Sequence, residues 1–229
     1  MAAPVVLRWG VLLEPVASLT DLALGLVSLY LFARFPRDRP ASRYWRATFF
    51  WAAVAALGGA VHHAVLVGDP QVARVSWAIV SSMVVVVMSF LLAASVIEVL
   101  GRSRAIVFWP LRLVGLVAYA VFAVTGHASI AAIMWCESIT VASVLGLWVW
   151  AGAHRHPKAR PMLIAIGASI AAAMFRLVPG LSGLVGLEPD SAYHLGQIAG
   201  MVLLFTAAAG STAALLPRRA HVPAADSAA

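Results

Sequence analysis

Histidines and carboxylates inside apolar segments are the residues with which this sequence could do chemistry. Two adjacent histidines, His62 and His63, close a long apolar run in the segment GGAVHHAV, and His194 lies in SAYHLGQIAG. Glu14 and Asp21 lie in the first apolar segment. An ionisable residue inside a membrane span costs at least about 2.5 kcal/mol and usually faces the interior of the helix bundle. We therefore expect these residues to bind a ligand or to take part in catalysis.

These residue types are the ligands of an open zinc site. Catalytic zinc is held by three protein ligands, often histidines and a carboxylate, and keeps a fourth position for water. We predict His62, His194 and Asp21 as the metal ligands, with Glu14 or His63 as other donors for the third position. Adjacent residues are about 100° apart around a helix, so at most one of His62 and His63 points into the site. Asp21 or Glu14 would also be the general base.

Three further polar residues are candidates for binding the substrate. Arg176 could hold an anionic headgroup or neutralise a carboxylate, and it could equally extend to the lipid headgroups. Glu137 lies in the apolar segment that contains MWCES. Gln197 follows His194 by three residues, and this spacing places both on one face of a helix.

Polar residues form a stripe on the first apolar segment. Glu14, Ser18, Asp21, Gly25 and Ser28 follow the spacing 4, 3, 4, 3, which is one face of a helix. Serine and glycine are enriched where membrane helices pack together, so the small residues favour a packing seam. The two carboxylates favour a functional site, because packing has no use for them.

Composition indicates a membrane protein. Hydrophobic residues make up 62% of the 229 residues, and charged residues only 11%, against roughly 25% in an ordinary soluble domain. A spanning helix needs about 20 apolar residues. The net charge of +7 does not indicate nucleic-acid binding, because the 16 Lys and Arg residues cluster in short segments between apolar runs.

The hydropathy pattern predicts an all-α fold, a bundle of seven membrane helices. The predicted spans are residues 11–33, 44–67, 72–100, 106–125, 128–153, 161–178 and 191–216. Residues 1–216 would form one domain, followed by a short disordered cytoplasmic tail at 217–229. Because cations gather in alternate loops, the positive-inside rule predicts an outer N-terminus and a cytoplasmic C-terminus in the plasma membrane. The polar residues would then form a pocket near the outer face.

The two histidine segments resemble those of a known superfamily. Seven spans, GGAVHHAV in the second and SAYHLGQIAG in the seventh resemble the seven-helix membrane hydrolases that include the alkaline ceramidases and the adiponectin-receptor-like proteins. The resemblance implies zinc held by one histidine of the second helix and two of the seventh, and hydrolysis of a lipid. The sequence departs from that pattern by having Gly58 or Gly59 in place of a serine, and Asp190 and Ile198 in place of a further histidine.

The function that these patterns favour is zinc-dependent hydrolysis of a lipid amide or ester, with membrane lipids as partners. The alternative is a non-enzymatic sensor, transporter subunit or ligand- or proton-binding protein, whose pocket takes its ligand from outside. A weaker alternative is a b-haem between His194 and either His62 or His63. A retinal protein is excluded, because the one lysine, Lys158, lies between two predicted spans.

Overall fold

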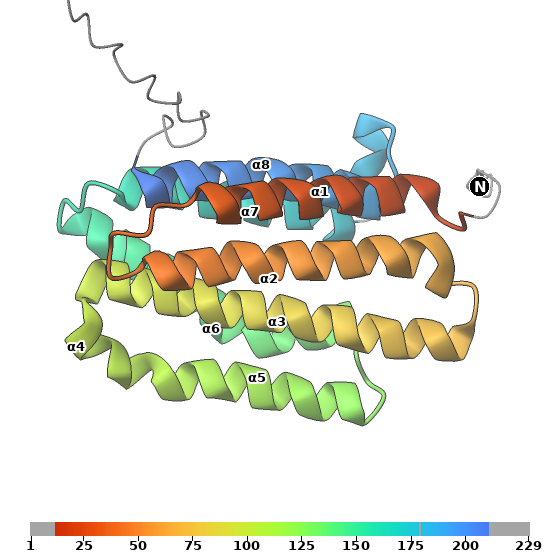
Figure 1. The fold of residues 1–229 in the computed structure, drawn as a ribbon, viewed down its shortest axis with the longest axis horizontal. Coiled ribbons are helices and arrows are strands. Elements are labelled where there is room, and N and C mark those ends of the chain that lie inside the picture. Colours follow the sequence, from red (N-terminus) through yellow and green to blue (C-terminus); the bar gives the residue numbers. More distant parts are fainter. Residues whose placement is uncertain (1–11, 179, 211–229) are drawn as a thin grey trace, which may run out of the picture.

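A computed structural model describes residues 12–178 and 180–210 of the chain (Figure 1). The long helices of this part are α1 (Pro15–Arg34), α2 (Ser42–Val61), α3 (Pro70–Leu100), α5 (Trp109–Val124), α6 (Ile130–Ala153), α7 (Ala159–Leu177) and α8 (Pro189–Ala209). The short helical segments are the π-helical η1 (His62–Leu66), α4 (Arg102–Ala105), η2 (Ile106–Phe108) and η3 (Ser182–Val185). The predicted all-α fold class is confirmed. The predicted tail at 217–229 lies outside the described residues.

Six helices of the described residues are long and apolar enough to cross a membrane: α1, α2 with η1, α3, α6, α7 and α8. Their outward faces expose large apolar side chains such as Leu26 of α1 and Ile79 of α3. The chain is therefore a polytopic membrane protein. The remaining predicted span corresponds to η2 and α5, and α5 has only 16 residues. That α5 also crosses the membrane stays a prediction.

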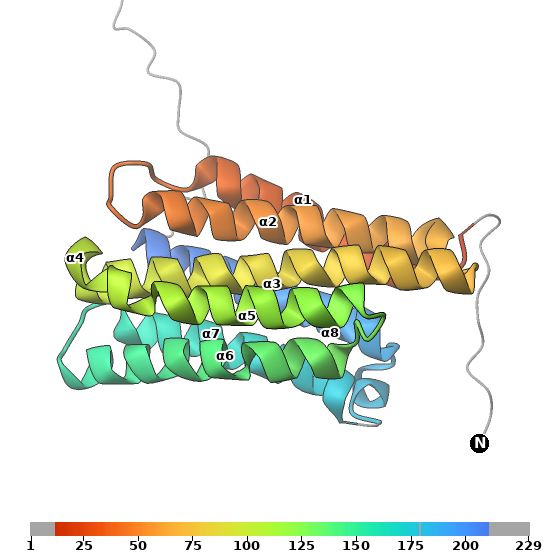
Figure 2. The ribbon, with the colours of Figure 1, turned by 90° about the horizontal axis from the view of Figure 1, so that it is seen from below.

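The long helices run along a common direction, with the chain reversing at the two ends of the bundle (Figures 1 and 2). Helix α3 packs against α2, α5 and α6, while α1 packs against α2 and α8, and α8 against α7. We call the end at which α1, α3, α6 and α8 begin the His end, because His62, His63 and His194 lie there. The opposite end, with the connections at 35–41, 101–108 and 154–158, is the basic end.

Local sequence explains where several helices begin and end. The Asp69 carboxylate accepts hydrogen bonds from the backbone N–H groups of Gln71 (2.8 Å) and Val72 (3.1 Å), which caps α3. These bonds stabilise the charged form and lower the pKa of Asp69. Helix α8 ends at Gly210, whose φ of 75° lies in the left-handed region that glycine adopts without strain.

The polar stripe of α1 faces the bundle, as its spacing predicts. Ser18, Asp21, Gly25 and Ser28 are all buried. The hydroxyl of Ser18 donates to the carbonyl of Ala60 on α2 (2.9 Å). A Cβ on Gly25 would lie 2.8 Å from the Leu57 side chain, so this glycine lets α1 and α2 approach closely.

Candidate metal centre

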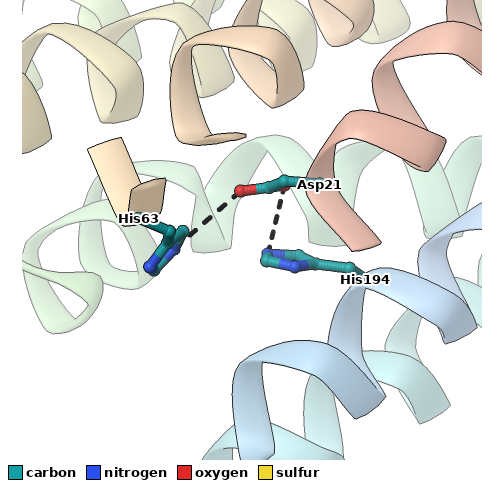
Figure 3. A group of neighbouring side chains, drawn as sticks. All are labelled: Asp21, His63 and His194. Carbon is teal, nitrogen blue, oxygen red and sulfur yellow. Dashed lines mark ion pairs between the residues drawn. The ribbon is translucent and has the colours of Figure 1, made fainter. Parts of the chain in front are cut away.

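Three buried side chains from three helices converge at the His end (Figure 3). Asp21 comes from α1, His63 from η1 at the end of α2, and His194 from α8. One potential ligand atom from each of them lies within 4.8 Å of the other two. Each residue exposes only 5% of its surface. We call Asp21, His63 and His194 the triad.

The distances within the triad are close to those of a metal site. Nε2 of His194 lies 3.3 Å from Oδ1 of Asp21, and Nε2 of His63 lies 3.8 Å from Oδ2 of the same carboxylate. Two ligands of a tetrahedral zinc ion, each at about 2.1 Å from it, are about 3.4 Å apart. The distance from His194 to Asp21 is thus close to that value, and His63 would have to move closer to Asp21 to coordinate the same ion.

A carboxylate orients the first of the two imidazoles. Nδ1 of His63 lies 2.5 Å from Oε2 of Glu14. An ionised carboxylate can only accept, so Nδ1 carries the proton and the lone pair of the neutral ring is on Nε2. The backbone N–H of Glu14 also donates to the carbonyl of His63 (3.1 Å), which fixes the start of α1 against η1. Glu14 thus contacts Nδ1 of His63, the ring nitrogen that does not face Asp21. Such an outer partner is typical of metal-binding histidines.

A hydroxyl orients the second imidazole. Nδ1 of His194 lies 3.1 Å from Oγ1 of Thr20. Oγ1 also lies 3.0 Å from the carbonyl oxygens of Val16 and Ala17, so the hydroxyl proton goes to the backbone. The hydroxyl oxygen then accepts from Nδ1–H of His194, which again leaves the ring lone pair on Nε2.

The triad therefore brings three electron-pair donors together. Both Nε2 lone pairs and the Asp21 carboxylate face one another in a buried place. Unpaired acceptors in a low-dielectric interior repel one another and have lost their water. A cation or a bound proton between them removes this cost.

Gly59 of α2 makes room for the Asp21 carboxylate, because glycine has no side chain. A Cβ on Gly59 would overlap Oδ2 of Asp21, so only glycine permits this placement. Gly59 lies four residues before His63, on the turn from which the helix widens into η1. In that π-helical turn the N–H of Val67 donates to the carbonyl of His62 (3.0 Å), and such turns occur frequently at functional sites.

His62 is placed differently from the sequence prediction. Its Nδ1 lies 2.8 Å from Oγ of Ser76 on α3, and its ring lies 5.9 Å from that of Trp77. It lines a cavity of about 270 Å³ next to α3 and the residues after α5. The structure therefore brings His63, and not the predicted ligand His62, together with Asp21 and His194, because the missing side chain at Gly59 leaves room for the Asp21 carboxylate.

None of the three predicted substrate-binding residues belongs to the triad, although Arg176 lies close enough to act electrostatically on Asp21 and His194. Arg176 makes an ion pair with Asp190 (2.6 Å between Nη1 and Oδ1) at the start of α8. Gln197 donates from Nε2 to the carbonyl of Ser169 (3.0 Å) and joins α8 to α7. Glu137 is buried on α6, the helix that packs against α3, α5 and α7.

Thr20 contacts His194 and was not among the residues predicted from the sequence. It lies beside Asp21 in the chain and is only partly buried. Its position one residue from the polar stripe is the only signal in the sequence, and a threonine within a membrane helix usually bonds to its own backbone.

The comparisons with known proteins give a family and no activity. A family model matches residues 16–213, which include the whole triad, and its description is a family of unknown function, DUF6962. No curated protein and no solved structure matches significantly. The chain therefore belongs to the DUF6962 family, a family of unknown function.

Proposed function

We propose that Asp21, His63 and His194 hold one zinc ion and that the protein uses it to hydrolyse a lipid amide or ester. The observation that carries the proposal is the convergence of two Nε2 atoms and a carboxylate whose outer partners, Glu14 and Thr20, direct the lone pairs inward. Two histidines and one carboxylate are the ligand set of several zinc hydrolases.

Each residue of the site has a separate task in this proposal. A zinc ion bound there would polarise a carbonyl group and turn a coordinated water molecule into a nucleophile. Glu14 holds the His63 ring in place, Thr20 holds the His194 ring, and Gly59 leaves space for Asp21. Asp21 has a second carboxylate oxygen, and this oxygen is the candidate for taking a proton from water.

The surroundings of the site support a lipid as the substrate. Helices α1, α2 and α8, which carry the triad, are membrane-spanning candidates, so a substrate reaching their buried side chains comes from the bilayer. The basic residues of the opposite end, among them Arg37, Arg102 and Arg155, favour the cytoplasm for that end. The proposed topology then places the triad near the outer face of the plasma membrane. Kinship with the seven-helix hydrolases is part of the same proposal.

A non-enzymatic role is the second candidate, and one distance favours it. The 3.3 Å between Nε2 of His194 and Oδ1 of Asp21 also fits a hydrogen bond from a protonated imidazole. In that case a proton, and not a metal ion, would join the acceptors, and the protein would be a proton-binding sensor or transporter subunit.

The experiment is a lipid-hydrolysis screen on protein reconstituted in liposomes. Lipids with amide or ester bonds are offered to wild-type protein, and products are detected by mass spectrometry. We expect a product that a chelator abolishes, that added zinc restores and that Asp21→Asn does not form. Metal-loaded protein that hydrolyses none of these lipids would contradict the hydrolase proposal and leave the metal site standing.

A further inference from the structure

A second buried carboxylate lies away from the triad, among α3, α5 and α6, which run side by side (Figure 2). Glu137 is the eighth residue of α6, about 10 Å along the helix from its start. It exposes only 5% of its surface. An ionisable residue inside a membrane bundle is by default a candidate for function.

The carboxyl group of Glu137 is only partly satisfied. Oε2 is buried and has no hydrogen-bond partner among the described residues. Oε1 lies 3.1 Å from the position that a Cβ on Gly115 of α5 would take, so the absence of a side chain there makes room for the carboxyl. The Thr140 hydroxyl, from the next turn of α6, flanks the same group.

Tyr119, one helical turn further along α5, does not supply the missing partner. Its side chain is almost completely buried, and its hydroxyl lies beside Ser81 of α3. Gly115 and Tyr119 are four residues apart and share one face of α5. The Tyr119 hydroxyl and Oε2 of Glu137 form no hydrogen bond with each other. Oε2 is therefore enclosed in an apolar region without a partner among the described residues.

The helices packed against α6 bring no cation to Glu137 within residues 12–178 and 180–210. Arg112 of α5 donates from Nε to Ser89 (3.0 Å), and Arg176 of α7 is paired with Asp190. The carboxylate Glu98 of α3 has Lys158. An ionised Glu137 would therefore be a buried charge without a counter-ion, which costs several kcal/mol.

We propose that Glu137 is a proton-binding site, independent of the triad, and that its carboxyl group is neutral in the folded protein. A proton on the carboxyl group removes the uncompensated charge. The Thr140 hydroxyl can still donate to the carbonyl oxygen of the neutral group. The ligand of this second site is a proton taken up from water, and no metal ion is required.

Infrared spectroscopy of purified protein at neutral pH tests this inference. The spectrum of wild type minus Glu137→Gln should contain the C=O stretch of a protonated carboxyl group, and this band should shift in D₂O. Glu98→Gln is the matched control, because Glu98 is partly buried and paired with Lys158, and it should remove carboxylate stretches instead. If Glu137→Gln also removes only carboxylate stretches, the proposal is wrong.

Thr140→Val keeps the inference testable should Glu137→Gln not fold. The variant should retain the protonated-carboxyl band and move it to higher frequency, because the hydrogen bond from the Thr140 hydroxyl to the carboxyl group is lost. A spectrum without a protonated-carboxyl band in wild type and in this variant would refute the proposal. Bound metal should be the same in both variants as in wild type, since neither residue contacts the triad.

Discussion

The carboxylates inside the two ends of the bundle have different partners. At the basic end, Lys158 makes an ion pair with Glu98 and donates to the carbonyl of Ala208 (2.8 Å), and Nε1 of Trp45 donates to the same carboxylate (3.4 Å). Arg39 donates to the last carbonyls of α8. At the His end, Asp21 faces two imidazole lone pairs and no Lys or Arg ion pair of the described residues reaches it.

The packing around the two ends differs in the same sense. Phe35, Phe49 and Phe205 pack together with ring centroids 5.6–5.9 Å apart towards the basic end, and Trp45 is also buried there. Around the triad, Gly59 leaves space for the Asp21 carboxylate, and the ring of Tyr193 lies 5.4 Å from that of His194. At the basic end, large side chains and ion pairs hold the helices together. At the His end, the Asp21 carboxylate makes no ion pair with a described Lys or Arg and can therefore bind a ligand.

Replacing Lys158 by methionine should give the largest effect on stability. Glu98 would lose its cation while its side chain stays only 13% exposed, and breaking a pair shielded from water costs up to about 3–5 kcal/mol. The free energy of unfolding in detergent measures it. The exposed Arg160→Met, on the same segment, should change stability by less than about 0.5 kcal/mol. Equal losses of stability in both variants would show that the ion pair between Lys158 and Glu98 does not stabilise the basic end.

Gly59→Ala should damage the metal site without touching a ligand. The new methyl group would displace Oδ2 of Asp21, and we expect zinc affinity to fall at least as far as with a lost orienting contact, about 10–100-fold. Competition with a chromogenic chelator measures the affinity. Gly58→Ala is the matched control, since its Cβ would meet only Val80 at 3.2 Å. Unchanged affinity in Gly59→Ala would mean that Asp21 is not a ligand.

Glu14→Ala removes the carboxylate behind His63. The imidazole keeps its place in the fold but loses the partner of Nδ1, so zinc affinity should fall about 10-fold with little loss of stability. The same competition assay, together with thermal unfolding, separates the two effects. A stability loss with unchanged affinity would assign Glu14 to holding α1 against η1 only.

Thr20→Val should have the smallest effect of the series. It removes the acceptor for Nδ1–H of His194 while keeping the shape of the side chain, and we expect affinity to fall by a factor of about 10 or less. Thr20→Ser keeps the hydroxyl and should bind zinc as wild type does. A serine variant as weak as the valine variant would show that the hydroxyl is not the relevant group.

More of the fold than of the site can be predicted from the sequence. Runs of apolar residues correctly predict six helices that are long and apolar enough to cross a bilayer, since both properties can be counted in the sequence. They say less about α5, whose helix is shorter than its apolar run of 106–125. The residue types of Asp21 and His194 already indicate a metal site, because their placement in a membrane helix is costly.

The choice between His62 and His63 shows what a pattern in the sequence leaves open. Both have a glycine four residues before them, so periodicity alone does not separate them. The decision depends on where the carboxylate of another helix lies and on the π-helical turn after Val61. Arg176 was likewise assigned to a substrate or a carboxylate, and its actual partner, Asp190, depends on how α7 meets α8.

The measurement that tests the central claim most directly is the zinc content of purified wild-type protein, His63→Ala and His62→Ala. The two histidines are adjacent, buried to the same degree and of one type, so they differ only in what they face. We predict about one zinc ion per chain in wild type and in His62→Ala, and none in His63→Ala. Zinc absent from all three proteins, or lost with His62 and retained without His63, would contradict the account.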